Sequence, residues 1–179
     1  LEVGCGPGVV LEFFAQQGFT VEGIDLSPEA VAMVDRRGYS ASVCDLECDD
    51  IAGGYDVILC LEVLQQVHDP VSVLIKLKQA LAADGELIVS LPNEFHLISR
   101  LQLMIGNSHL GKFTHSHLRL FSPERDRELF ARAGLEIACK KHLSIVPPRL
   151  RWLARLSRPF AVWLPSSFAL SSLYRVRAK

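Results

Sequence analysis

Three glycines spaced two residues apart open the chain: Gly4, Gly6 and Gly8. The apolar stretch 1–3 leads into them, and an apolar helix is expected to follow from about Pro7 to Gln17. Glycine lets the backbone turn tightly and approach a ligand without a Cβ in the way. The unpaired N–H groups at the start of the helix would then point at that ligand. A strand, a glycine-rich turn and a helix are typical of the first unit of a nucleotide-binding α/β fold.

A carboxylate is expected at the end of the next strand, 19–25. Asp25 follows the glycines at close to the roughly 20-residue interval at which an acidic residue meets the ribose hydroxyls of a nucleotide. A carboxylate suits that task because it accepts two hydrogen bonds from a vicinal diol. The alternative is that Asp25 only caps the turn before the next helix, for which Ser27 and Pro28 are typical starting residues.

Two stretches carry a family resemblance. Glu2-Val3-Gly4-Cys5-Gly6-Pro7-Gly8 resembles motif I of the class I S-adenosylmethionine (SAM) methyltransferases, whereas a dinucleotide fingerprint reads G-x-G-x-x-G. The stretch 61–70 resembles the segment after the fourth strand of small-molecule methyltransferases, often written E-V-L-E-H-V-x-D-P. The resemblance implies SAM as cofactor and an α/β fold, with a doubly wound, mostly parallel seven-stranded Rossmann-like sheet and an antiparallel hairpin at its edge. A glycine-rich turn that binds no ligand is the alternative.

The resemblance also implies which residues bind SAM. By position they are the acidic residue and the glycines of motif I, an acidic residue for the ribose, another for the adenine amino group, and neighbouring backbone. These are Glu2, Gly4, Gly6, Gly8, Asp25, Leu26, Asp45, Leu46 and Leu61. A solvated loop carboxylate is the alternative for Asp45, because it stands among several other acidic residues.

The catalytic residue is less clearly indicated. The family's frequent Glu-His pair is Gln65-Gln66 here, and glutamine has no useful basicity. Methyl transfer from a sulfonium is an in-line displacement, so positioning supplies much of the rate. A base is needed only when the accepting atom holds its proton. His68 is the candidate base because a histidine titrates in the useful range, and an ordinary surface histidine is the alternative.

A long segment, 93–121, separates the expected strand 86–91 from the next helix. Inserts at the carboxyl ends of strands are where α/β folds cover their substrates, so we expect an acceptor-side lid here. His115, His117 and Arg119 are its candidate substrate residues. The two histidines could also share a metal ion, but no third ligand can be assigned and no metal is predicted.

The last part of the chain is basic. The formal net charge is −1, yet every charged residue after Glu136 is Lys or Arg. Strands are expected at 135–143 and 173–177. The family resemblance implies that the second of these strands is inserted beside strand 86–91. Between the two strands lies an insertion, 147–168. Within that insertion, Arg149 to Arg158 has an amphipathic pattern. Arginines opposite Trp and Leu favour peripheral membrane contact over nucleic acid. Packing of the apolar face on the sheet edge is the alternative, and a protein partner is the third.

With 179 residues, the chain is expected to form one domain, 1–179, with the two insertions described above. Five scattered cysteines without zinc spacing predict reduced thiols. No apolar run is long enough to cross a bilayer. A cytoplasmic protein is therefore expected, with peripheral membrane contact through 147–168 as the open alternative. Only three residues precede the glycines, which predicts a first strand that is truncated.

The patterns together predict a SAM-dependent methyltransferase that acts on a small-molecule or lipid-like acceptor. Two alternatives belong to other classes of protein. One is a non-catalytic partner with the SAM-binding fold that regulates another enzyme, which would fit the loss of the Glu-His pair. The other is a nicotinamide-dependent oxidoreductase, which is disfavoured because the third glycine comes one residue early. The acceptor and the methylated atom are not indicated.

Overall fold

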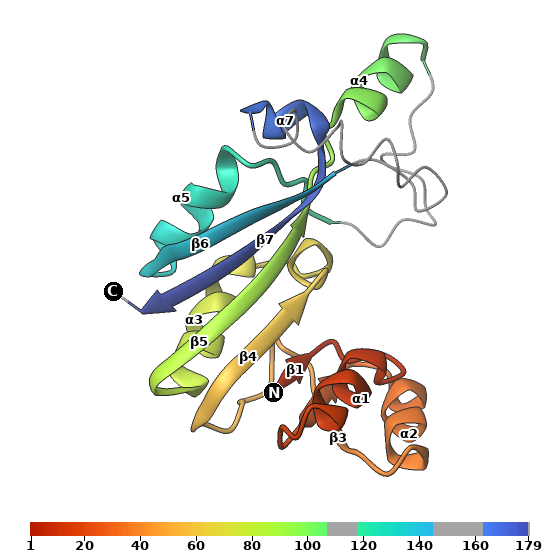
Figure 1. The fold of residues 1–179 in the computed structure, drawn as a ribbon, viewed down its shortest axis with the longest axis vertical. Coiled ribbons are helices and arrows are strands. Elements are labelled where there is room, and N and C mark those ends of the chain that lie inside the picture. The colour runs from red at the N-terminus through yellow and green to blue at the C-terminus, as the bar shows by residue number, and fades with distance from the viewer. Residues whose placement is uncertain (107–117, 145–162, 179) are drawn as a thin grey trace.

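A computed structural model describes residues 1–106, 118–144 and 163–178. Within them, seven strands form one sheet in the order β3-β2-β1-β4-β5-β7-β6 (Figure 1). Strands β1 to β5 are parallel to one another, and β7 runs antiparallel between β5 and β6. The strands are β1 (Glu2–Val3), β2 (Glu22–Asp25), β3 (Ser40–Val43), β4 (Tyr55–Leu61), β5 (Leu81–Pro92), β6 (Leu135–Ser144) and β7 (Ala169–Ala178). The predicted sheet, with its last strand inserted beside β5, is confirmed.

The helices begin where their capping residues indicate. Ser27 accepts a hydrogen bond from the Ala30 N–H at the start of α2, and Asp69 caps α3, each followed by proline. The helices are α1 (Val9–Gln16), α2 (Pro28–Arg36), α3 (Pro70–Ala80), α4 (Leu97–Met104), α5 (Arg125–Arg132) and α7 (Pro165–Phe168), with a 3-10 turn η1 (Leu64–Gln66).

Two boundaries differ from the prediction. Strand β5 begins at Leu81, directly after α3 ends at Ala80, instead of at residue 86. Leu81 pairs with Tyr55 of β4, so the extra residues satisfy backbone groups of β4 that would otherwise have no sheet partner on that side. Strand β7 likewise starts at Ala169, where it pairs with Ser144 at the far end of β6.

Helices cover both faces of the sheet, as a doubly wound fold requires. Val3 belongs to the main apolar cluster, which includes Leu74 and Leu77 of α3. Its neighbour Glu2 accepts a hydrogen bond from the backbone N–H of Leu11 in α1. Because successive side chains of a strand point to opposite faces, α1 and α3 lie on opposite sides of β1.

Several predictions fall on residues that the structure does not describe. His115 and His117 lie in 107–117, and the expected amphipathic helix 149–158 lies in 145–162. The single-domain organisation, the lid at 93–121 and the insertion at 147–168 therefore stay predictions. None of the helices in the described part of the chain has the length and apolar character that a bilayer-spanning segment needs.

Candidate cofactor and acceptor site

The loop between β1 and α1 uses its three glycines in two ways. All three have positive φ, with values of 67°, 50° and 78° at Gly4, Gly6 and Gly8. A Cβ on Gly4 would lie 2.5 Å from Val63 Cγ2, and one on Gly8 would lie 2.9 Å from Val34 Cγ2. A Cβ on Gly6 would meet no described atom within 4 Å. The outer glycines therefore allow close packing, whereas the space beside Gly6 is open.

Asp25 holds this loop in place from the end of β2. Its Oδ2 accepts a hydrogen bond from the Gly6 N–H at 2.8 Å, and its Oδ1 accepts one from the Ser27 N–H at 2.9 Å. The bond to Ser27 is the turn-capping role considered as the alternative, and the bond to Gly6 is a second role. Each carboxylate oxygen still has a further lone pair for a hydroxyl donor.

Glu2 is a buried carboxyl group at the start of the same loop. Its side chain is only 5% exposed, and its Oε2 has no hydrogen-bond partner among the described residues. Burial raises the pKa of this carboxyl group to about 7, while the Leu11 N–H that it accepts acts in the opposite direction. An unpartnered carboxylate oxygen beside the glycine loop suits a positively charged ligand.

A cavity of about 680 Å³ opens at the other end of β1 and is lined by residues that include Leu1, Val21 and Tyr55. It lies at the amino-terminal ends of the strands. Open α/β sheets bind nucleotides outside the carboxyl ends of their strands. The lining of the cavity also includes Glu2 and Leu11, so the cavity reaches the start of the glycine loop from the amino-terminal side of the sheet, away from the edge at which this fold class binds nucleotides.

Asp45 and Leu46 lie in the loop after β3, which α3 holds rigidly. Lys76 donates from Nζ to three carbonyl oxygens, those of Leu46, Glu47 and Asp49, at 3.1, 3.0 and 3.0 Å. The Asp45 carboxylate accepts the Glu47 N–H at 2.9 Å. This loop is thus fixed beside β2, since the Cys44 N–H donates to the Asp25 carbonyl oxygen at 3.0 Å.

His68, the predicted base, is paired with a carboxylate. Its ring is 81% exposed, and Nδ1 lies 2.8 Å from Glu47 Oε2, a contact that lowers the pKa of Glu47. Arg119, predicted on the acceptor side, donates from Nε to the His68 carbonyl oxygen at 3.1 Å. The structure therefore brings His68 and Arg119 together. Neither of these contacts involves the glycine loop.

Glu62 is a candidate that the sequence analysis missed. In the described part of the chain it is the one non-glycine residue with positive φ, at 57°. Its Oε1 accepts hydrogen bonds from Ser90 Oγ of β5 at 2.8 Å and Ser171 Oγ of β7 at 2.9 Å. Such backbone strain costs about 1–3 kcal/mol and persists where surrounding contacts enforce it, often at functional sites. The position follows Leu61 directly, at the carboxyl end of β4.

Gln65 takes a structural role next to this carboxylate. The residue is 1% exposed, and its Nε2 donates to the Glu62 carbonyl oxygen at 2.9 Å. The backbone carbonyl oxygen of Gln65 accepts hydrogen bonds from the backbone N–H groups of Leu118 and Arg119 at 2.7 and 3.1 Å. The end of the predicted lid is therefore anchored beside β4. In the sequence, Glu62 was indicated only by its place in the motif-like stretch 61–70, because its serine partners come from strands that are distant along the chain.

A model of the methyltransferase domain matches residues 1–140. The chain belongs to the methyltransferase domain family. The ubiquinone biosynthesis O-methyltransferase of Burkholderia thailandensis is 28% identical over 160 residues, which cover 82% of this chain and 68% of the relative. This protein is a SAM-dependent methyltransferase, as the motifs predicted.

Solved structures share the fold of this methyltransferase. A SAM-dependent methyltransferase from Thermotoga maritima, described as a possible histamine N-methyltransferase, aligns with a TM-score of 0.71 at 19% identity. That alignment covers 99% of this chain and 80% of the other. The magnesium protoporphyrin IX methyltransferase of Synechocystis, solved with bound SAH, aligns with a TM-score of 0.68 at 18% identity, over 99% of this chain and 73% of that one.

The residues present fit the cofactor. SAM carries a sulfonium and an ammonium group, and Glu2 offers an unpartnered buried oxygen near the loop. Open space above Gly6 leaves room for the ligand's approach. Among the described residues, no group of three or more His, Cys, Asp or Glu side chains is placed to hold a metal ion.

Proposed function

We propose that this methyltransferase binds SAM between the glycine loop and the loop after β3, and methylates a small-molecule or lipid-like acceptor beside Glu62. The observation that carries the proposal is the pair of hydrogen bonds by which Asp25 holds Gly6 and Ser27. They preform the loop, and since this fold class binds the ribose at the end of its second strand, the same carboxylate would be available to the ribose hydroxyls.

Each part of the cofactor has a proposed contact. The ribose hydroxyls would donate to Asp25, and the adenine ring would pack on Leu26, an apolar side chain that is 67% exposed. The adenine amino group would donate to Asp45. The backbone of Gly6 and Leu61 would contact the methionine part, with Glu2 compensating its charge, and Gly4 and Gly8 would keep the loop narrow.

SAM supplies an activated methyl group on a positively charged sulfur. The protein's share of the chemistry is to align the acceptor and to accept its proton where one is lost. Two groups compete for the second task. His68 has a carboxylate partner in Glu47. Glu62 lies at the carboxyl end of β4, where its exposed carboxylate can accept a hydrogen bond from an acceptor hydroxyl.

Calorimetric titration with SAM and with NAD tests the cofactor assignment. We expect SAM to bind and NAD not to bind. The Asp25→Ala variant should bind SAM about 1–3 kcal/mol more weakly, or 5- to 150-fold, because the ribose hydroxyls lose their hydrogen-bond acceptor. Urea unfolding of the same variant serves as a control for the loss of the Gly6 and Ser27 bonds. A folded Asp25→Ala protein that binds SAM as tightly as the parent would overturn the site.

The acceptor class is tested separately with methyl-labelled SAM and fractionated cell extract. We expect label to appear in a small-molecule or lipid fraction. Label confined to protein or nucleic acid would contradict the proposal. Binding of SAM without any label transfer would argue for the regulatory alternative.

A further inference from the structure

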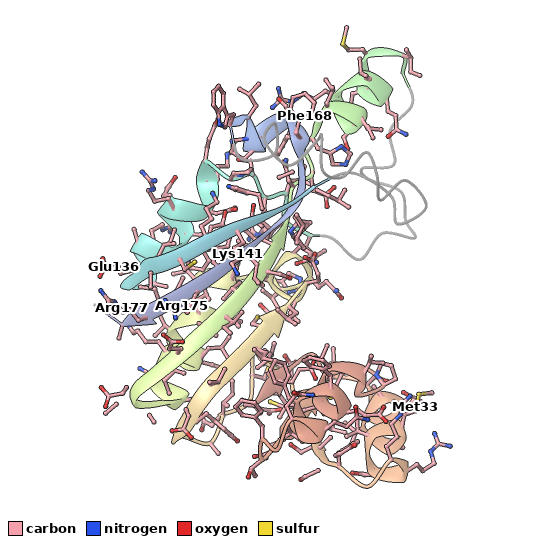
Figure 2. The ribbon with its side chains drawn as sticks, viewed as in Figure 1. Met33, Glu136, Lys141, Phe168, Arg175 and Arg177 are labelled. Carbon is pink, nitrogen blue, oxygen red and sulfur yellow. The ribbon has the colours of Figure 1, made fainter. Side chains whose placement is uncertain are left out.

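One end of the molecule carries an unusually apolar exposed surface, which we call the apolar pole. It consists of Leu97, Ile98, Leu101, Leu103 and Met104 of α4, the following Ile105, and Trp163 and Leu164 before α7. Met104, Ile105 and Trp163 are 81%, 78% and 84% exposed. Helix α4 packs against α7 beyond the carboxyl end of β5, at the top of Figure 1. Figure 2 places Phe168 at this end and Met33 at the opposite one.

Helix α4 lacks the polar outer face that a water-exposed helix normally has. Ser99 is buried, and the Nε of Arg100 donates back to the Phe95 carbonyl oxygen at 2.6 Å. Apolar side chains project on several sides instead. Apolar patches of this kind on a folded protein commonly mark an interaction surface, for a protein or for a membrane.

The apolar pole is attached firmly to the acceptor side of the sheet. Asn93, which follows β5 and is 2% exposed, donates from Nδ2 to the carbonyl oxygens of Pro165, Ser166 and Ala169 at 3.2, 3.2 and 2.8 Å. This buried amide joins the end of β5 to α7. A partner that binds the apolar pole therefore lies next to the carboxyl ends of β4 and β5.

Charge distinguishes between the possible partners. In the sequence, the stretches 95–123 and 137–179, to which the residues of the apolar pole belong, contain no Asp or Glu, and their charged residues are all Lys or Arg. All 20 acidic residues of the chain lie elsewhere. A surface for a second copy of this chain needs apolar complementarity but no exclusion of carboxylates. A surface that meets phosphate headgroups needs apolar side chains and also the absence of carboxylates.

We infer that the apolar pole docks on an anionic lipid bilayer. The aliphatic side chains of α4 enter the boundary between headgroups and acyl chains, Trp163 lies at headgroup level, and Arg100 meets lipid phosphates. Of the insertion 147–168 predicted to contact membranes, only residues 163–168 belong to this described surface. The inference goes beyond the proposed function, because docking requires neither cofactor nor acceptor.

Co-sedimentation with vesicles tests this. The probes are vesicles of phosphatidylcholine alone and of phosphatidylcholine with phosphatidylglycerol, at low salt, with no SAM. We expect the parent protein to sediment with the anionic vesicles only, and Met104→Glu/Ile105→Glu to bind them about tenfold more weakly or not at all. The matched control is Phe13→Glu/Met33→Glu, which changes two residues that are 57% and 45% exposed on α1 and α2. This control should bind like the parent.

Fluorescence gives a second readout that does not depend on those variants. The chain has two tryptophans, so Trp152→Phe leaves Trp163 as the reporter. Its emission should shift to shorter wavelength with anionic vesicles. The inference is overturned if the parent stays in the supernatant with anionic vesicles or binds neutral vesicles equally well. It is also overturned if the two double variants bind anionic vesicles alike, or if the parent is a dimer that Met104→Glu/Ile105→Glu converts to a monomer. Because no methyl transfer is measured, failure here is separate from failure of the proposed function.

Discussion

Replacing Glu2 by Gln should make the protein's stability much less dependent on pH. The amide oxygen of Gln can still accept the Leu11 N–H at the start of α1, so the variant removes the charge while keeping the shape. The folded carboxyl group has a pKa of about 7, against an ordinary value of 4.5. A pKa raised on folding means that the contribution to stability is fully present below 4.5 and is lost as the pH rises through 7.

The expected size follows from those two pKa values. Each pKa unit corresponds to about 1.4 kcal/mol, so ionising buried Glu2 costs roughly 3 kcal/mol of unfolding free energy well above pH 7. Between pH 5 and pH 8 the parent should lose roughly 2–3 kcal/mol relative to Glu2→Gln. Asp126, whose pKa burial raises to about 6, titrates in both proteins and cancels in the difference.

Urea unfolding of parent and variant, without cofactor, at pH 5, 6, 7 and 8 measures this difference directly. The free-energy gap between Glu2→Gln and the parent should widen in favour of the variant from pH 5 to pH 7 and begin to level off towards pH 8. A gap that stays constant across the four pH values would refute the reasoning, because it would show that Glu2 ionises in the folded protein as easily as in the unfolded one.

Two further predictions concern the glycine loop and the acceptor side. Gly4→Ala and Gly6→Ala should both lower the midpoint of thermal unfolding, because each places a Cβ on a residue with positive φ. Gly4→Ala should lower it further, because its Cβ also meets Val63 Cγ2 at 2.5 Å, whereas Gly6→Ala should mainly weaken SAM binding in calorimetry. Equal behaviour of the two variants would contradict the assigned roles. Glu62→Ala and His68→Ala should both leave SAM affinity unchanged. The proton acceptor is the residue whose replacement lowers the rate of label transfer from SAM more and changes its pH profile. A loss of SAM affinity in either variant would place that residue at the cofactor instead.

Local signals made much of this fold predictable. The caps at Ser27 and Asp69 depend on neighbouring residues alone, so the starts of α2 and α3 follow from the sequence. The position of β7 beside β5 was predicted only through the family resemblance, since pairing between distant strands leaves little trace in composition. The start of β5 was misplaced for the same reason, because Leu81 is extended and pairs with Tyr55 of the neighbouring strand.

The residues of the candidate site also fall into those that the sequence indicated and those that it did not. The glycines and Asp25 were found because their spacing is regular, but the hydrogen bond from Gly6 to Asp25 joins two elements and has no sequence signature. Glu62 was missed because its left-handed backbone and its serine partners depend on three strands meeting. The exposure of α4 was likewise hidden, since its apolar pattern equally suits a buried helix.

The two hydrogen bonds to Asp25 bear on how the loop tolerates mutation over evolutionary time. Both donors are backbone N–H groups, so any residue other than proline at position 27 preserves its bond. The acceptor, by contrast, is a side chain that shapes the loop and is proposed to hold the ribose. A descendant that gave up the cofactor would still need this carboxylate to keep the loop folded. Asp25 should therefore persist even in lineages that lose catalysis, and its presence alone would be poor evidence of retained activity.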